Sequence, residues 1–413
     1  MKNHPIATPE QHEHELEALA LIEHPVVKEA YARVKADWRE KANPSPAMLE
    51  CFDWAFHEVM FSAAVWSSNQ DALRPKVVTI SRLAHRVGDV SVPGSRWGID
   101  NPDSIYRVIP ISGDEEYRIH GRVGENRMTE NYFTLWDENM NTVDVLSGHD
   151  LVLNEDRTFT ISVDAQPANG RPNHVQSAPE AHEFYIRDVM LDWSRDEPNE
   201  LRVERLGDAP SSPPKTLDEQ AQLTAKFMAH YADFTHRLSQ GSLHGKPNRF
   251  SLGWSADTGG ALRKQVYVGG HFRLEEDEAF VIHVSDGGAA YFVVPIANIW
   301  GTTLTIVDRT SSLNKAQSMA NADGTYTYVL SRNDPGVHNW LDTCDMDEGM
   351  LTLRMAEFPE GGPREDLSAR GEILKLADLP SQLPEGTVFV GSEERSEQQA
   401  QRAAGYKRRL PEA

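Results

Sequence analysis

Hydrophobic and polar positions follow two different periods along the chain. Residues 1–90 carry apolar side chains at intervals of three and four, which indicates amphipathic helices. The segment Thr8-Pro9-Glu10-Gln11 combines the hydroxyl, proline and glutamine that open a helix. The pattern predicts helices that begin at Thr8 or extend over Pro25–Lys41, Ala47–Trp66 and Asn69–His85.

From Val90 the period shortens to that of strands. Short runs rich in β-branched and aromatic residues alternate with Gly, Asn, Asp and Pro, which is typical of an antiparallel sandwich. The predicted strands are Ser104–Ile111, Glu116–Val123, Tyr132–Asp137, Thr158–Val163 and Phe184–Leu191. A Ser-Pro linker and a helical stripe from Leu217 to Leu238 follow, and strand signals then return from Arg249 to about residue 358.

The two strand-rich regions repeat one another. Thr158 and Thr325 lie 167 positions apart, as do Arg187 and Arg354, and Asn173 precedes Asn339 by 166. Matches at nearly constant spacing indicate two copies of one unit. The predicted fold class is therefore α+β, with N-terminal helices and two tandem antiparallel β-sandwich or jelly-roll-like repeats joined by a helix.

The predicted organisation has five segments. Their residues are 1–90 (N-terminal helical region), 91–209 (first β-sandwich repeat), 210–245 (linker and connecting helix), 246–360 (second β-sandwich repeat) and 361–413 (C-terminal tail with a charged helix).

Composition limits the classes of partner. The 413 residues carry a formal charge of −22, which disfavours binding to nucleic acids and to anionic membranes. The N-terminus lacks the apolar core of a signal peptide, and no apolar run approaches the ~18 residues of a membrane span. Cys51 and Cys344 form no disulfide framework and no CxxC pair. We expect a cytoplasmic protein without nucleic-acid or membrane partners.

Several common cofactor sites have no support in the sequence. The chain contains no GxxxxGK[ST] phosphate loop, no GxGxxG after a strand and no GxSxG nucleophile elbow. No cofactor and no metal site are predicted.

Candidate chemistry concentrates in the second repeat. A Pro-Gly corner presents His338 and Asp342, which are the predicted catalytic pair for proton transfer. Aromatic rings there can stack on a ligand ring, and guanidinium groups can bind a carboxylate, a phosphate or hydroxyls. The predicted substrate-binding residues are Trp300, Arg309, Asn314, Asn339, Trp340 and Arg354.

Two interpretations of the recurring residues remain open. Because Asn173 and Arg187 recur as Asn339 and Arg354, shared architecture explains them at least as well as a binding site does. Residues unique to the second copy, such as Trp300 and Arg309, are better candidates for function on this argument.

The Pro335-Gly336 corner carries a family resemblance. The segment Asn339-Trp340-Leu341, the preceding Asn298-Ile299-Trp300 and the later Arg354 resemble the bacterial family called domain of unknown function 1214, most closely over residues 262–358. Asn101-Pro102-Asp103 and Tyr106 resemble the front half of longer members of that family, which indicates a weaker related repeat upstream. The resemblance implies a β-sandwich or jelly-roll unit and assigns no reaction.

Three functions are compatible with these features. The first is a cofactor-independent hydrolase or lyase that acts on a small hydroxylated or ring-bearing metabolite bound in a β-sandwich cavity. The second is a non-catalytic protein that binds a small molecule or carbohydrate. The third is an oligomeric structural or assembly protein. A small-molecule ligand and a homo-oligomer are the expected partners.

Overall fold

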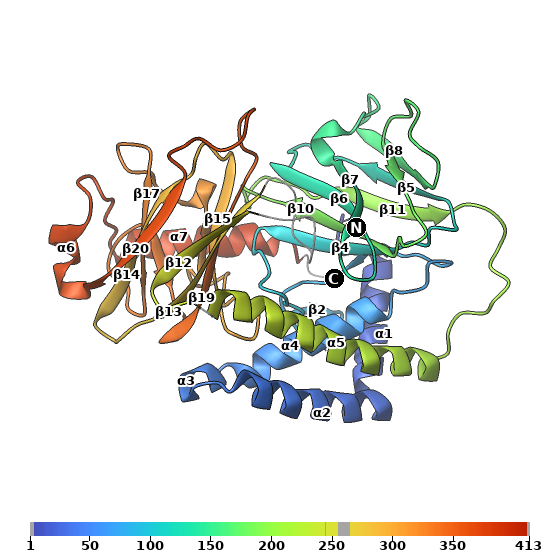
Figure 1. Cartoon of the computed structure of the whole chain (residues 1–413), viewed down its shortest axis with the longest axis horizontal. Coiled ribbons are helices and arrows are strands. Elements are labelled where there is room, and N and C mark those ends of the chain that lie inside the picture. The colour runs from blue at the N-terminus through green and yellow to red at the C-terminus, as the bar shows by residue number, and fades with distance from the viewer. Residues whose placement is uncertain (1–3, 244, 255–264, 411–413) are drawn as a thin grey trace.

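Two β-sandwiches lie side by side above a layer of helices in the computed structural model, which describes residues 4–243, 245–254 and 265–410 (Figure 1). The fold class is α+β, with the sheets repeated in two halves, as predicted. No helix in these described ranges is both long and apolar enough to span a lipid bilayer.

The N-terminal helices form the base of the molecule. Thr8 caps the first by accepting a hydrogen bond from the backbone of Gln11 at 3.0 Å. The predicted continuous helix over Ala47–Trp66 is broken at Glu50, and two helices replace it. The helices are α1 (Pro9–Glu23), α2 (Pro25–Ala42), α3 (Pro46–Leu49) and α4 (Phe52–Ser67).

The predicted helix over Asn69–His85 is wrong. The side chain of Asn69 donates to the backbone oxygen of Lys76 at 2.9 Å and accepts from its backbone nitrogen at 3.3 Å, which closes a loop. Pro75 disfavours the helical conformation of the residue before it. The segment instead carries the short strand β1 (Val78–Thr79) and the start of β2 (His85–Val87), which pairs with β3 (Val90–Val92).

The first sandwich packs a five-stranded sheet on a four-stranded one. The five-stranded sheet has the order β1-β4-β10-β6-β7, and the other has the order β11-β5-β8-β9. The strands are β4 (Ser104–Pro110), β5 (Tyr117–Arg122), β6 (Glu130–Trp136), β7 (Thr142–Ser147), β8 (Thr158–Asp164), β9 (His174–Gln176), β10 (Glu183–Val189) and β11 (Glu200–Arg205).

The second sandwich repeats this topology strand for strand. Its five-stranded sheet has the order β12-β13-β19-β15-β16, and its four-stranded sheet has the order β18-β17-β14-β20. In both copies the one parallel pair is the matching one, β8 with β9 and β17 with β18. The strands are β12 (Arg249–Trp254), β13 (Val266–Arg273), β14 (Glu278–Ser285), β15 (Tyr291–Ala297), β16 (Ser312–Asn314), β17 (Tyr326–Ser331), β18 (Trp340–Asp342), β19 (Glu348–Ala356) and β20 (Ser368–Lys375).

The C-terminal segment joins the second sandwich. Strand β20 lies within the predicted tail, yet it pairs with β14 along its whole length, so the sandwich continues beyond residue 360. Helix α6 (Leu379–Gln382) follows, and α7 (Ser392–Lys407) is the predicted charged helix. Arg395 of α7 binds the carboxylate of Asp334 at 2.9 Å.

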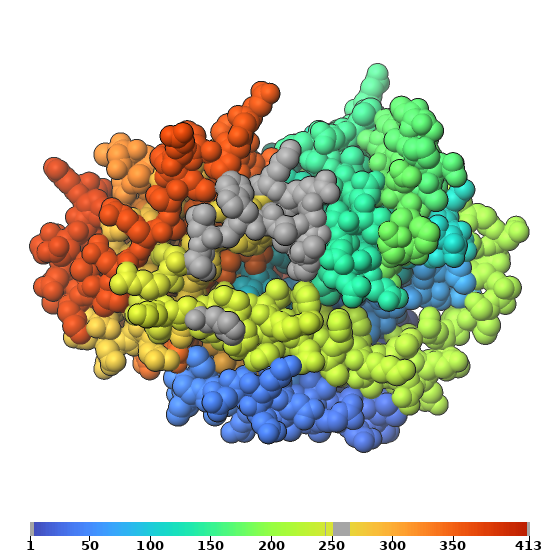
Figure 2. All heavy atoms as spheres, viewed as in Figure 1, coloured from blue at the N-terminus to red at the C-terminus, as the bar shows by residue number. Residues whose placement is uncertain are grey.

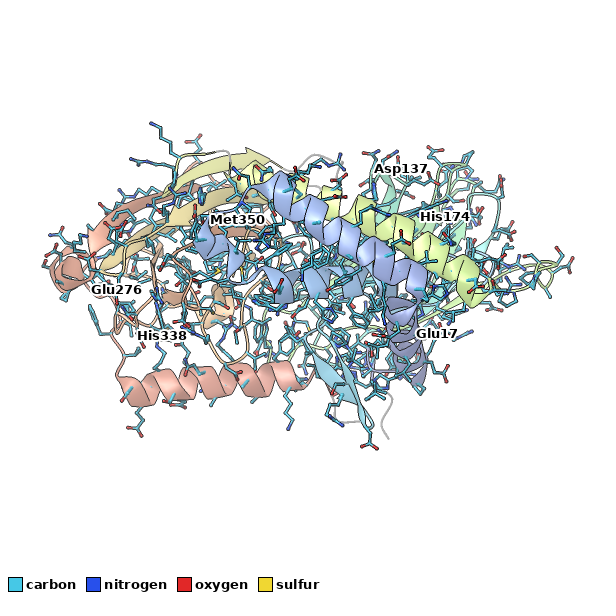
Figure 3. All side chains as sticks on the ribbon, turned by 90° about the horizontal axis from the view of Figure 1, so that it is seen from below. Glu17, Asp137, His174, Glu276, His338 and Met350 are labelled. Atoms are coloured by element: carbon cyan, nitrogen blue, oxygen red, sulfur yellow. The ribbon has the colours of Figure 1, made fainter. Side chains whose placement is uncertain are left out.

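Helix α5 (Leu217–Leu243) connects the sandwiches and packs against α2 and α4 (Figures 1 and 3). Phe184 and Ile186 of β10 point into the first core, and Leu351 and Leu353 of β19 point into the second. The alternate residues of these strands therefore face out of each sandwich. Because every residue of β10 is buried, its outer face is covered by other parts of the chain.

Candidate functional site

Most of the predicted site residues have structural partners. Trp300 is fully buried against the N-terminal helices, with its ring 4.3 Å from that of Phe52 between centroids. Its indole nitrogen donates to the backbone oxygen of Met48 at 2.8 Å. Trp300 thus fixes the second sandwich to the helical base.

The predicted proton-transfer pair makes two separate sets of contacts. Asp342 accepts two hydrogen bonds from Arg309, at 2.6 and 2.8 Å, and a third from the backbone of Cys344. His338 instead contacts the backbone oxygen of Gln317 at 3.3 Å and lies on the side of the molecule that carries α7 (Figure 3). Among the described residues, no hydrogen bond or ion pair joins His338 to Asp342.

Asn339 has the same role as its counterpart in the first copy. Its side chain accepts from the backbone nitrogen of Met319 and donates to the backbone oxygen of the same residue, both at 2.8 Å. Asn173 makes the same two contacts with Val152, also at 2.8 Å. Shared architecture therefore accounts for the contacts of this recurring asparagine.

The remaining two residues of the second copy also serve the framework. Asn314 caps a short 3₁₀ helix and donates to the carboxylate of Asp103 at 2.9 Å. Trp340 is buried, with the guanidinium of Arg395 lying 5.1 Å from its ring centroid. Roles for these side chains in catalysis or ligand binding remain predictions.

Arg354 differs from the others because it lines a cavity between the two sandwiches. This inter-repeat pocket has a volume of about 380 Å³. Both sandwiches, the loop before β4 and the end of α5 contribute to it. Figure 2 shows the two sandwiches at either side of the molecule, with α5 running below them. The lining residues are Trp97, Gly98, Ile99, Asp100, Tyr106, Trp136, Met140, Tyr185, Arg187, Phe234, Leu238, Gly241, Ser242, Tyr267, Gly269, Thr352 and Arg354.

The first sandwich supplies an aromatic wall. The rings of Trp136 and Tyr185 stack at 4.2 Å between centroids with 15° between their planes. The guanidinium of Arg187 lies 4.5 Å from the Tyr185 centroid and 5.3 Å from that of Trp136. The negative face of each ring attracts the guanidinium of Arg187 and so helps to hold it in place. This wall is therefore held in place before any ligand arrives.

The second sandwich supplies smaller residues at the matching positions. Tyr185 and Thr352 lie 167 positions apart on the equivalent strands β10 and β19. Trp136 pairs with Glu183 of β10, and Ala297 pairs with Met350 of β19. Because Glu183 and Met350 are also 167 positions apart, Trp136 and Ala297 occupy matching positions. The positions of the two large rings of the first copy thus carry small side chains in the second, and of these Thr352 also lines the pocket.

The two arginines occupy the same register position in the two copies. Arg187 lies opposite Tyr106, and Arg354 lies opposite Tyr267. Arg354 reaches across to the first copy, where it donates to the Tyr106 hydroxyl at 3.4 Å and to the backbone oxygen of Ile99. One Tyr-Arg pair from each repeat therefore lines the same pocket.

The loop that contacts Arg354 has strained backbone. Ile99 has φ = 56°, in the left-handed region that β-branched residues rarely adopt. Its amide donates to the backbone oxygen of Gly301 at 2.7 Å, which fixes the loop to the second sandwich. Strain of this kind is concentrated at functional sites. The bend directs the Ile99 carbonyl toward Arg354.

Carboxyl groups near the pocket tend toward the neutral form. Burial raises the pKa of Asp100, whose oxygens accept hydrogen bonds from Thr303 at 3.0 and 2.7 Å. Glu130 is fully buried behind Tyr267, to which Gln265 links it. Burial, reinforced by the nearby Glu357, raises the pKa of Glu130 to about 8. Burial thus opposes ionisation of both carboxyl groups.

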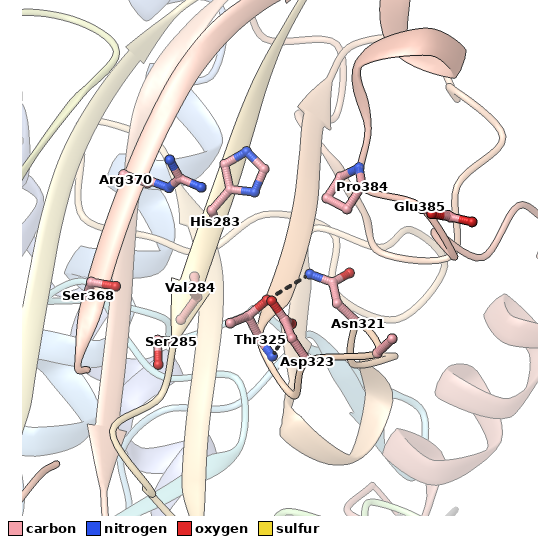
Figure 4. Close-up of a pocket in the computed structure, with 11 residues that line it drawn as sticks. His283, Val284, Ser285, Asn321, Asp323, Thr325, Ser368, Arg370, Pro384 and Glu385 are labelled. Atoms are coloured by element: carbon pink, nitrogen blue, oxygen red, sulfur yellow. Dashed lines mark hydrogen bonds between the residues drawn. The ribbon is translucent and has the colours of Figure 1, made fainter. Parts of the chain in front are cut away.

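A second cavity of about 350 Å³ lies on the outer face of the second sandwich (Figure 4). His283, Arg370 and Ser368 line it from the sheet, and Asn321, Asp323 and Glu385 line it from loops. The cavity contains no aromatic side chain other than the His283 imidazole, and it contains none of the predicted site residues. It is more polar and less enclosed by rings than the inter-repeat pocket.

Of the predicted set, the structure brings only Arg354 into the inter-repeat pocket. Trp136, Tyr185, Arg187 and Tyr267 were not predicted. The spacing of 167 between Arg187 and Arg354 was a usable signal for them. Alternation along a strand places Arg187 and Arg354 on the outer faces of their sheets, where the two sandwiches meet.

Comparisons with known proteins show the fold and no activity. No protein-family model and no curated protein sequence matches the chain, so the resemblance to domain of unknown function 1214 stays a prediction. A crystal structure of an uncharacterised protein from Burkholderia cenocepacia matches with a TM-score of 0.72 and 23% identity. The match covers 88% of this chain and all of the other. The VPA0106 protein from Vibrio parahaemolyticus matches with a TM-score of 0.37 and 12% identity, over 67% of this chain and 90% of that one.

Proposed function

We propose that the protein binds a ring-bearing small molecule in the inter-repeat pocket. The observation that supports this proposal is the cavity of about 380 Å³ lined by the Trp136–Tyr185 stack of the first sandwich and by Tyr267, Thr352 and Arg354 of the second. Pockets of this size hold small organic ligands, and rings stack on aromatic side chains. Thr352, a small residue, lines the same cavity as the Trp136–Tyr185 stack, so the cavity has space for a ligand ring.

A hydrolase or lyase that uses the same pocket is the second candidate. Asp100 favours it, because this residue lines the pocket and burial raises the pKa of its carboxyl group. A carboxyl group whose pKa is raised above its usual range can act as a general acid or base. Thr303 holds both carboxyl oxygens, so Asp100 is already oriented. Catalysis would start with the same binding event.

The proposal is tested by a variant that fills the pocket with the side chain found at the matching position of the first sandwich. Thr352→Tyr places a ring where the first sandwich has Tyr185, and it should abolish ligand binding without unfolding the protein. Saturation-transfer NMR with 2-naphthoate, 2-naphthamide and 2-naphthol as probes measures binding, and the melting temperature measures folding. Ser368→Tyr is the matched control, because it adds a ring at the second cavity.

The outcomes separate the candidates. Binding that Thr352→Tyr abolishes and Ser368→Tyr leaves intact supports the inter-repeat pocket. The proposal is overturned if no probe binds the wild-type protein, or if Thr352→Tyr binds every probe as the wild type does. An ester or hydroxy acid of a bound probe tests the second candidate. If the wild type converts it and Asp100→Asn does not, the protein is an enzyme rather than a binding protein.

A further inference from the structure

The inter-repeat pocket contains polar atoms that lack partners. Arg354 and Thr352 lie two residues apart on β19 and face the same side of the strand. The Nε atom of Arg354 and the hydroxyl oxygen of Thr352 are both buried, and neither has a hydrogen-bond partner in the described part of the chain. Other buried side-chain atoms of the described residues also lack partners, but these two lie on one face of a strand that lines a cavity, where a bound group can supply partners.

Arg354 also lacks a counter-charge. A guanidinium carries five N–H donors. Among the described residues, Arg354 donates only to the Tyr106 hydroxyl and the Ile99 carbonyl, and it forms no ion pair. Both acceptors are neutral. A partly buried charge that is neither paired nor fully hydrogen-bonded is costly unless a bound group completes it.

The nearby acids do not supply that charge. Asp100 directs its two oxygens to Thr303, and burial favours its protonated form. Glu130 accepts from Gln265 instead of Arg354, and burial raises its pKa to about 8. The positive charge of Arg354 is therefore available to a ligand.

Resting on the proposed function, we infer that the ligand of the inter-repeat pocket is an aromatic carboxylate. Its ring lies against Trp136 and Tyr185, and its carboxylate accepts hydrogen bonds from Arg354 and from the hydroxyl of Thr352. An arginine fork matches the two oxygens of a carboxylate, and the charge strengthens each hydrogen bond. The carboxylate supplies the counter-charge that Arg354 lacks and, once the two side chains turn toward it, a partner for each of the two atoms.

The experiment compares an acid with its neutral isostere. Isothermal titration of the full chain with 2-naphthoate and 2-naphthamide at pH 7 should show the acid binding at least about 30-fold more tightly. Arg354→Gln should reduce that ratio to about 1–3, and Thr352→Val should weaken binding of the acid several-fold. Arg370→Gln, which removes an exposed guanidinium at the second cavity, is the matched control and should leave the ratio unchanged.

Each outcome has one meaning. Equal affinity for acid and amide in the wild type overturns the carboxylate inference and leaves the pocket proposal standing. Failure of both compounds and of 2-naphthol to bind overturns the pocket proposal instead. If Arg354→Gln does not fold, the wild-type ratio and Thr352→Val still decide. Naphthoate binding that Arg354→Gln and Thr352→Val leave intact overturns the assignment of these two residues.

Discussion

The two sandwiches share a topology but differ where they face each other. The first carries Trp136 and Tyr185 on the outer face of its five-stranded sheet, and the second carries Ala297 and Thr352 at the matching positions. The arginines at the next matching position are present in both copies. The two copies thus differ in side-chain size at the interface, where the cavity lies, while their strand order is the same.

The four-stranded sheets, in contrast, keep the same contacts on their outer faces in both copies. On the outer face of the first, His120 contacts Thr160 at 3.1 Å and Glu204 at 3.2 Å. On the second, His283 contacts Thr327 at 3.2 Å and Glu372 at 3.5 Å. These recurring contacts lie on partly exposed faces, and in the second copy α6 covers the neighbouring apolar half through Leu379. Recurrence alone therefore marks the framework as often as a site.

The largest effect on the pairing of the sandwiches should come from Asp103. Its buried carboxylate accepts from Trp193 at 2.7 Å, from Asn314 at 2.9 Å and from the Tyr291 hydroxyl at 2.8 Å. Asp103→Ala leaves three donors from both copies unpaired, and we expect a loss of about 3–5 kcal/mol in unfolding free energy. Urea unfolding measures it.

An exposed aspartate provides the control for Asp103. Asp89→Ala changes a side chain that makes no described hydrogen bond or ion pair, so its unfolding free energy should stay within about 0.5 kcal/mol of the wild type. A loss below about 1 kcal/mol for Asp103→Ala would show that apolar contacts, and not this carboxylate, hold the sandwiches together.

The architecture was largely predictable from the sequence, because it depends on periodicity. The five strands predicted for the first sandwich correspond to β4, β5, β6, β8 and β10, with ends that differ by one or two residues. The helix over Asn69–His85 was wrong because a side chain of Asn69 binds the backbone seven residues later. The strand β20 was missed because it falls in a polar segment whose pairing with β14 depends on tertiary contacts.

The candidate site was much less predictable. Residues unique to the second copy were favoured, yet Trp300 and Asn314 turned out to contact the helical base and the first sandwich. The pocket forms only when the outer faces of two sheets meet across about 170 residues of sequence. No local pattern records that meeting, and only the recurrence of Arg187 as Arg354 pointed to it.

The free energy of unfolding should depend on pH through Glu130, which has no acidic counterpart in the second copy. The position of Glu130 in the first copy is that of Tyr291 in the second. Burial raises the pKa of Glu130 from about 4.5 to about 8, so the folded protein keeps a proton that the unfolded chain releases. Stability should therefore fall as the pH rises from about 5 to 8, by at most roughly 1.4 kcal/mol per pH unit, and level off above 8.

Glu130→Gln should remove that slope. Urea midpoints of wild type and variant at pH 5.5, 6.5, 7.5 and 8.5 measure the difference, in which the titration of histidines elsewhere cancels. Glu357, Arg187 and Arg354 also act on Glu130, and they are the same in both proteins. A difference that does not change with pH would show that Glu130 is ionised in the folded protein throughout this range.

The smallest effects should come from the recurring asparagines, and they test whether Asn339 belongs to a site. Asn173→Ala removes two hydrogen bonds to Val152, and Asn339→Ala removes two to Met319 and one to Thr327, so each should cost about 1–2 kcal/mol. Asn173 has φ = 47°, so its replacement should cost up to about 1 kcal/mol more. Neither should change the affinity for 2-naphthoate. If Asn339→Ala lost binding at unchanged stability while Asn173→Ala did not, the substrate-binding role predicted for Asn339 would replace the structural one.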